Sequence, residues 1–293
     1  MSAMKKNIVM RLMAVVLTAA ANGVAATPAD PYGLLLKPIP DKTVVLSFDD
    51  GCKSDAAFVA PLLKKHGFNA TFYITGAEWF KARKDRFMTW EEIKSIEDMG
   101  FEIGNHTVHH WGLSAHSVKN CIMTTEGMEE RFKAEGLGAA DTFCWPLYAV
   151  NKAFVPVLAE KGYRFARGGG ERAYDPMTDS PMNVPSFTLH DRALDKDPDA
   201  FIKQAQMAKD GKIAVFCLHG VPDLEHPGVS LKPERFAEMM TYLKENDYHV
   251  ISMRDLGAYI DAQKALLYLN RAEVYPWGCL LYTSDAADEY QRV

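Results

Sequence analysis

The chain has 293 residues, of which 48% are hydrophobic, 11% aromatic and 24% charged, and its formal net charge is −5. This ordinary charged fraction, together with the aromatic content, excludes a disordered chain. A mildly acidic balance without a basic block predicts no nucleic-acid partner. After the N-terminus, no apolar run is long enough to span a membrane. The length is typical of one large α/β domain or of two small ones.

The first 26 residues have the pattern of a secretory signal peptide. Lys5, Lys6 and Arg11 form a positive region, an apolar run follows at 12–21, and Val24-Ala25-Ala26 is a small-residue cleavage site. This order of charge, apolar run and small residues directs export and is removed from the mature protein. We therefore expect a periplasmic or secreted protein. A buried N-terminal helix is the alternative.

Residues 279–293 differ in character from the rest of the chain. The stretch from Cys279 onward resembles the translation of an adapter used in preparing sequencing libraries, and such scars are excluded from fold reasoning. A natural polar tail is the alternative. We expect residues 27–278 to form a single domain, because no linker rich in proline, glycine or serine divides them.

Short apolar runs alternate with helical patterns along this domain. Strands are predicted from β-rich apolar runs, and helices from apolar residues recurring at helical spacing between capping and terminating residues. The expected strands are 43–48, 70–74, 101–103, 142–145, 163–166, 186–189, 212–218 and 249–253. The expected helices are 55–66, 90–99, 114–135, 151–161, 198–209 and 233–245. Thr89 and Glu92 have the spacing of a capping box for the second of these helices.

Seven or eight strand-then-helix units in one domain predict a closed parallel barrel of the α/β class. An open doubly wound sheet is the rival fold, and it usually carries a glycine-rich dinucleotide loop after its first strand. Here the first strand instead ends in Asp49-Asp50-Gly51. In a barrel the loops after the strands carry the chemistry, so the strand ends are where functional residues are expected.

Two adjacent carboxylates end the first strand. Adjacent side chains in a strand point to opposite faces, but at a strand end Asp49 and Asp50 can approach one cavity from different angles. One carboxylate can then bind a metal while the other acts as a base. A surface Asp-Asp-Gly turn is the alternative for this segment on its own.

Three histidines follow the third strand within five residues. His106 and His110 are four residues apart, so one helical turn would place both imidazoles on one face and allow them to chelate a divalent cation. With Asp50 the ligand set becomes two histidines and one carboxylate, which leaves positions open for water and substrate. A solvated loop is the alternative.

A further histidine, His219, follows the apolar run 212–218. At the end of a barrel strand it would lie near the mouth of the barrel, and an imidazole is suited to act as a general acid near neutral pH. A core histidine satisfied by backbone groups is the alternative.

These strand ends, in this order, resemble the motifs of the polysaccharide deacetylase family (NodB homology domain, carbohydrate esterase family 4). The family's first motif is matched by Ser47–Gly51, and its second, His-Ser/Thr-x-x-His, by His106–His110. Its fifth, a strand ending in Leu-x-His, is matched at His219, with Cys217 in the place of the leucine. The resemblance covers roughly residues 44–256 and implies a distorted (β/α) barrel.

The resemblance also implies roles for these residues. It makes Asp49 the catalytic base and His219 the catalytic acid. It makes Asp50, His106 and His110 the ligands of a divalent metal ion, Zn²⁺ or another such as Co²⁺ or Ni²⁺. The substrate would be an acetylated glycan.

Two motifs depart from the family pattern. The third, Arg-x-Pro-Phe/Tyr, is replaced by Cys144-Trp145-Pro146-Leu147, so the arginine that orients the base is absent. Its oxyanion-stabilising N–H maps to Leu147, and a backbone donor needs no particular side chain. Arg167, at the end of the fifth strand, is a hypothetical substitute for the arginine. The fourth motif, an aspartate that tunes the catalytic histidine, has three possible matches: Asp175, Asp179 and Asp191.

The expected function is therefore metal-dependent removal of acetyl groups from an N-acetylated polysaccharide or oligosaccharide, resembling chitin or peptidoglycan, with release of acetate. One alternative is another hydrolase on the same site, such as an O-acetyl xylan esterase or an amidohydrolase. A second alternative is a carbohydrate-binding pseudoenzyme, which the missing arginine favours and the intact acidic and histidine motifs oppose.

Overall fold

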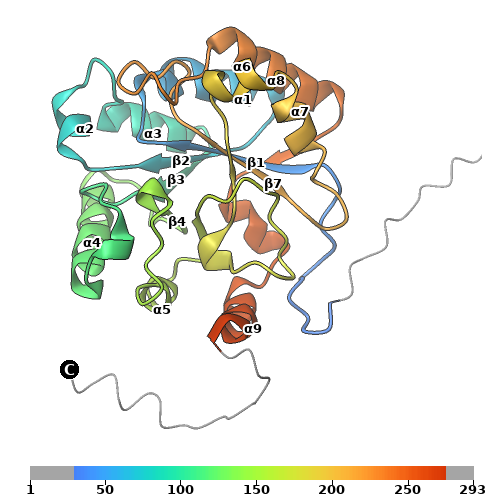
Figure 1. Cartoon of the computed structure of the whole chain (residues 1–293). Coiled ribbons are helices and arrows are strands. Elements are labelled where there is room, and N and C mark those ends of the chain that lie inside the picture. Colours follow the sequence, from blue (N-terminus) through green and yellow to red (C-terminus); the bar gives the residue numbers. More distant parts are fainter. Residues whose placement is uncertain (1–29, 275–293) are drawn as a thin grey trace, which may run out of the picture.

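The computed structural model describes residues 30–274 of the chain (Figure 1). The predicted signal peptide at 1–26 and the predicted adapter-derived tail at 279–293 lie outside the described residues. Within residues 30–274, no helix combines the length and the apolar character that crossing a membrane requires.

The centre of the molecule is one parallel sheet. Its eight strands are β1 (Thr43–Asp49), β2 (Thr71–Ile74), β3 (Glu102–Asn105), β4 (Thr142–Cys144), β5 (Phe165–Arg167), β6 (Phe187–Thr188), β7 (Ala214–Leu218) and β8 (His249–Ile251). Seven of them follow the order β5-β4-β3-β2-β1-β7-β6, and β8 pairs with β1. All of these pairings are parallel, so the carboxyl ends of the strands lie together at one end of the sheet.

The sheet curls into a barrel that is irregular in two places. β8 pairs with the first three residues of β1, whereas β2 pairs with the last three, so two short strands share one edge of β1. At the opposite side, β5 meets the segment before β6 through a single parallel bridge between Arg167 and Val184. The predicted distorted (β/α) barrel of seven or eight parallel strands is confirmed.

Helices cover the outside of this sheet. In Figure 1, α1 (Ala60–His66), α6 (Asp191–Lys196), α7 (Ala200–Ala205) and α8 (Pro233–Glu245) lie above β1 and β7. On the opposite side lie α4 (Val118–Ala134), α5 (Val155–Glu160) and α9 (Ala262–Val274), and beside β2 lie α2 (Glu78–Ala82) and α3 (Trp90–Asp98). A π-helical turn, Asp55–Val59, precedes α1, and four short 3₁₀ turns lie at Leu113–Ala115, Pro146–Tyr148, Pro181–Asn183 and Arg254–Ala258.

Several predicted boundaries move in the structure. The capping box of α3 is present, with Glu92 and Thr89 bonded to each other's backbone N–H. The helix expected from residue 114 begins at Val118 instead, because Ser117 is extended and its hydroxyl caps the N–H of Asn120. The sequence pattern did not predict α2, α6 and α9. It predicted longer helices than the structure has at α5 and α7.

β1 is held rigidly at the middle of the core. All seven of its residues are buried, and the ring of Phe48 stacks on Phe72 at 5.1 Å and meets Phe236 edge-on at 5.8 Å. Burying an aromatic side chain of this size contributes about 1.5–3 kcal/mol to stability. The two carboxylates that end β1 therefore start from a well-anchored strand.

Candidate active site

Polar side chains at the carboxyl ends of five strands lie at the same end of the barrel. Because parallel strands present their carboxyl ends together, residues far apart in the sequence meet there. Asp49, Cys144 and Arg167 are the last residues of β1, β4 and β5, and His106 and His219 directly follow β3 and β7.

Asp49 forms a buried ion pair with Arg167. The Nη2 of Arg167 contacts the Oδ2 of Asp49, and the arginine is fully buried. Its guanidinium lies between two aromatic rings, 5.7 Å from the centre of Tyr73 and 5.4 Å from that of Tyr148. Burial alone raises the pKa of Asp49, but the charges of Arg167 and the nearby imidazoles outweigh it and hold this pKa well below the usual carboxyl range. Asp49 is therefore ionised.

The position of Arg167 follows from strand register. Cys144 stands where the third family motif has its arginine, and β4 and β5 pair so that Cys144 lies directly opposite Arg167. The guanidinium thus reaches Asp49 from the neighbouring strand. The structure places the hypothesised substitute arginine in contact with the hypothesised base.

Asp49 and Asp50 both approach His106, because the chain turns sharply after Asp49. Asp50 and Gly51 both have left-handed backbone angles, with φ of 72° and 70°. The Oδ1 of Asp50 lies 3.6 Å from the Nε2 of His106 and 3.4 Å from that of His110, and its Oδ2 lies 3.8 Å from the Nε2 of His219. Burial raises the pKa of Asp50 to about 6; the Asp49 charge adds to the rise and His219 opposes it.

The two metal-motif histidines converge through a loop rather than a helix. The expected helical turn over 106–110 is wrong, because Thr107 and His110 have left-handed φ angles of 64° and 54°. Hydrogen bonds hold this unusual backbone: the N–H of Thr107 donates to the Oδ1 of Asn105 at 2.8 Å, and the N–H of His110 donates to the Oγ1 of Thr107 at 3.1 Å.

The His106 ring is fixed by its other nitrogen. Its Nδ1 lies 3.0 Å from the carbonyl oxygen of Cys144, and this contact is a hydrogen bond only if Nδ1 carries the proton. The Nε2 is then a free acceptor facing Asp50. Burial lowers the pKa of His106 to about 3, so the ring is neutral and suited to bind a cation.

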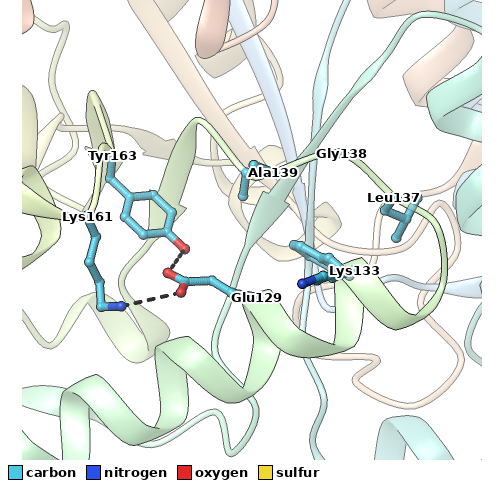
Figure 2. A pocket seen from close by; sticks show the side chains of 9 residues that line it. Glu129, Lys133, Leu137, Gly138, Ala139, Lys161 and Tyr163 are labelled. Atoms are coloured by element: carbon cyan, nitrogen blue, oxygen red, sulfur yellow. Dashed lines mark hydrogen bonds and ion pairs between the residues drawn. The ribbon is translucent and has the colours of Figure 1, made fainter.

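Asn105 connects this loop to a cavity at the side of the barrel. Its Nδ2 donates to the hydroxyl of Tyr163 at 2.7 Å, and that hydroxyl donates to Glu129 at 3.0 Å. Figure 2 shows Tyr163 and Lys161 converging on Glu129 in this cavity of about 350 Å³. Its lining comes from α4 and the segments before β4 and β5, so it is separate from the carboxyl ends of the strands where Asp49 lies.

Three side chains bring possible metal-ligand atoms close together. The carboxylate of Asp50 and the Nε2 atoms of His106 and His110 all lie within 4.8 Å of one another. Ligands about 2.0–2.1 Å from a tetrahedrally bound Zn²⁺ are separated by about 3.4 Å, close to the separations from Asp50. The Oδ1 of Asp50 is buried without a hydrogen-bond partner among the described residues, which is expected of an atom that binds a cation. The donor set therefore fits a divalent ion.

Other predicted residues are placed less centrally. Leu147 has a left-handed φ of 55° in the turn after β4, and its side chain is largely exposed. None of the three candidate tuning aspartates is placed to serve His219, since each pairs with a cation elsewhere. Asp175 pairs with Lys212, Asp179 with Arg172 and Asp191 with Arg235.

The proline-containing segment after His219 reaches the metal ligands through an aromatic ring. Trp79 meets His226 of this segment edge-on at 5.4 Å and His110 edge-on at 5.7 Å. His226 also lies 3.5 Å from the buried carboxylate of Asp223. The segment after His219 is therefore linked to His110 through the ring of Trp79.

Pattern reasoning gave no role at this site to two cysteines and a tyrosine. The Sγ atoms of Cys144 and Cys217 lie 3.7 Å and 3.5 Å from the Oδ2 of Asp49, and Tyr73 packs against Arg167. The four cysteines among residues 30–274 are free thiols. The position of Cys144 in the third motif was the one available signal.

Comparison with known proteins agrees with this arrangement. The model of the polysaccharide deacetylase family matches residues 37–166. The chain is therefore similar to the polysaccharide deacetylase family over this stretch, which is less than half of its length. The matched stretch contains Asp49, Asp50, His106 and His110, whereas Arg167 and His219 fall beyond it.

Curated relatives in this family are bacterial deacetylases. The chain is 28% identical over 143 residues to a peptidoglycan-N-acetylglucosamine deacetylase of Bacillus cereus, covering 46% of this chain and 61% of the relative. It is 32% identical over 98 residues to a peptidoglycan-N-acetylmuramic acid deacetylase of Bacillus subtilis, covering 33% and 35%. It thus matches less than two thirds of the length of either relative.

Solved structures share the fold. A family 4 carbohydrate esterase pseudoenzyme from Bacillus anthracis superposes with a TM-score of 0.52 at 20% identity, covering 75% of this chain and 69% of that one. A family 4 carbohydrate esterase of Bacillus subtilis superposes with a TM-score of 0.50 at 23% identity, covering 74% and 81%. At these identities the likeness establishes the NodB-like fold alone.

Proposed function

We propose that this protein is a metal-dependent hydrolase that removes acetyl groups from an N-acetylated glycan and releases acetate. The observation that carries the proposal is the cluster of Asp50, His106 and His110 beside the ionised Asp49–Arg167 pair. It combines a ligand set for a divalent cation with a carboxylate suited to act as a base. The relatives named as peptidoglycan deacetylases support an acetylated cell-envelope glycan as substrate, met after export.

Each residue then has a distinct role. Asp50, His106 and His110 would hold Zn²⁺, Co²⁺ or Ni²⁺, and such an ion, when bound, lowers the pKa of a coordinated water and polarises a carbonyl. Asp49 accepts the proton of the attacking water, and Arg167 keeps Asp49 ionised and oriented. His219 donates a proton to the departing amine, and the N–H of Leu147 stabilises the negative oxygen of the tetrahedral intermediate.

A carbohydrate-binding pseudoenzyme is the second candidate. The replacement of the motif arginine by Cys144 favours it. The contact between Arg167 and Asp49 opposes it, because a guanidinium still neutralises the base from the adjacent strand. The metal ligands and His219 are also present, so we propose hydrolysis ahead of binding.

Acetate release after metal removal tests this proposal. The purified chain is incubated with N-acetylated chitooligosaccharide, peptidoglycan and acetylated xylan before and after chelation. We expect acetate from an N-acetylated substrate, a fall to background with the chelator, and recovery on adding Zn²⁺ or Co²⁺. Demonstrated metal binding without hydrolysis of any amide or ester in the panel would favour the pseudoenzyme.

His219→Ala is expected to impair amide hydrolysis more than ester hydrolysis. An amine is a poor leaving group without a proton, whereas the phenoxide released from an aryl ester needs little assistance. We expect kcat for an N-acetyl substrate to fall by about 10²–10³-fold and kcat for an aryl acetate ester by less than about tenfold. His249→Ala, at the amino end of β8, is the matched control. Equal losses on both substrates would contradict the role of His219 as the acid.

A further inference from the structure

Cys144 places a sulfur atom beside Asp49 and His106. The proposed deacetylation does not use this sulfur. Its Sγ lies 2.7 Å from the Nη2 of Arg167 and 4.0 Å from the Nε2 of His106. The sulfur, an Asp49 oxygen and a His106 nitrogen all lie within 4.8 Å of one another, and all three residues are buried. Carboxylate, imidazole and thiolate are together a common ligand set for zinc and related ions.

This second donor set overlaps the first at one atom. The Nδ1 of His106 faces the carbonyl of Cys144, so only the Nε2 is available for an ion, and it has one lone pair. An ion bound by Asp50, His106 and His110 therefore excludes an ion bound by Asp49, His106 and Cys144. Metal softness decides between the two, because thiolate ligands favour thiophilic ions.

The Cys144 sulfur is held in place beside the other two donors. It contacts the Nη2 of Arg167, and the same atom contacts Asp49. Asp49, His106 and Cys144 are all buried, so an ion bound between them would be screened from solvent.

We propose that Asp49, His106 and Cys144 form a second, inhibitory metal site for thiophilic divalent cations such as Cd²⁺ or excess Zn²⁺. The inference rests on the proposed function, because inhibition follows from occupying Asp49, the base of that reaction. Coordination forms a metal–sulfur bond and releases the thiol proton to solvent, with no change of oxidation state.

Cadmium absorption distinguishes this site from the Asp/His/His set. The metal-free full chain is titrated with Cd²⁺ while ultraviolet thiolate-to-metal charge transfer is recorded. We expect a band in the wild type and in Asp50→Asn, which lacks a ligand of the first set, and no band in Cys144→Ser. Cys217→Ser is the matched control and should keep the band, because Cys217 belongs to neither donor set assembled by the described part of the chain.

Inhibition gives a second readout. Excess Cd²⁺ should inhibit acetate release by the Co²⁺-loaded wild type. The Cd²⁺ concentration that inhibits Cys144→Ser should be at least about tenfold higher. Absence of the band in the wild type, its persistence in Cys144→Ser, or its loss in Cys217→Ser would overturn the proposal. Cadmium NMR of the wild type reports a sulfur ligand directly if a variant does not fold. Acetate release with Co²⁺ but no charge-transfer band would refute the second site and leave the proposed function standing.

Discussion

Replacing Arg167 with methionine is expected to lower kcat for glycan deacetylation by about 10²–10³-fold. Methionine keeps much of the side-chain volume but removes the charge that holds down the pKa of Asp49. Burial then dominates and raises this pKa, so a smaller fraction of Asp49 is ionised at a given acidic pH. The acid limb of the kcat/KM profile should move to higher pH, which a pH–rate series on wild type and variant measures.

Stability and control variants separate this catalytic effect from simple damage. Removing one partner of a buried ion pair costs about 3–5 kcal/mol, so denaturant unfolding of Arg167→Met should show a large loss that the double variant with Asp49→Asn partly recovers. Arg164→Met is the matched control, because Arg164 is partly exposed and pairs with Asp141 at the surface. Unchanged turnover and an unchanged pH profile in Arg167→Met would show that Arg167 does not serve the base.

His106→Ala is expected to abolish stoichiometric metal binding and to lower deacetylation by about 10³-fold or more. His106 contributes to both donor sets, and its ring is locked by the carbonyl of Cys144. Its loss would therefore remove a ligand from both of the proposed metal sites. Metal content after dialysis, measured alongside acetate release, checks both effects, and the cadmium band should disappear as well.

His109→Ala is the matched control for this variant. His109 belongs to the same loop, but its side chain is exposed and stacks on Trp111 at 4.1 Å rather than facing Asp50. We expect metal content within about twofold of the wild type. If His106→Ala retained one ion per chain with full activity, the assignment of the ligand set would be refuted.

The fold was largely predictable because its local signals agree with the tertiary structure. Each of the eight expected strands overlaps an observed strand, the capping box at Thr89 is present, and α8 has the predicted boundaries. The short helices were harder to predict from the sequence. α6 has six residues and is capped by the ring of His190, which accepts the N–H of Ala193, and helices of this length depend on tertiary packing rather than on intrinsic propensity.

The candidate site was predictable in its composition but not in its geometry. Asp49, Asp50, His106 and His110 stand in dense local motifs, so their residue types and spacing were informative. The path of the chain between the histidines was not, because two left-handed residues replace the expected helical turn. Threonine rarely adopts that conformation, and at Thr107 it is held by contacts with Asn105 and His110 that come from the folded loop.

The sequence by itself determined the repeated strand-and-helix pattern, the acidic and histidine motifs and the absence of the motif arginine. Only the tertiary structure decided which arginine contacts Asp49. Arg167 meets Asp49 because β5 pairs with β4 in the register that sets it opposite Cys144. That register depends on hydrogen bonds between strands distant in the chain, and no local pattern encodes it. The same end of the barrel holds the thiol of Cys144 beside Asp49, which is the basis of the proposed second metal site.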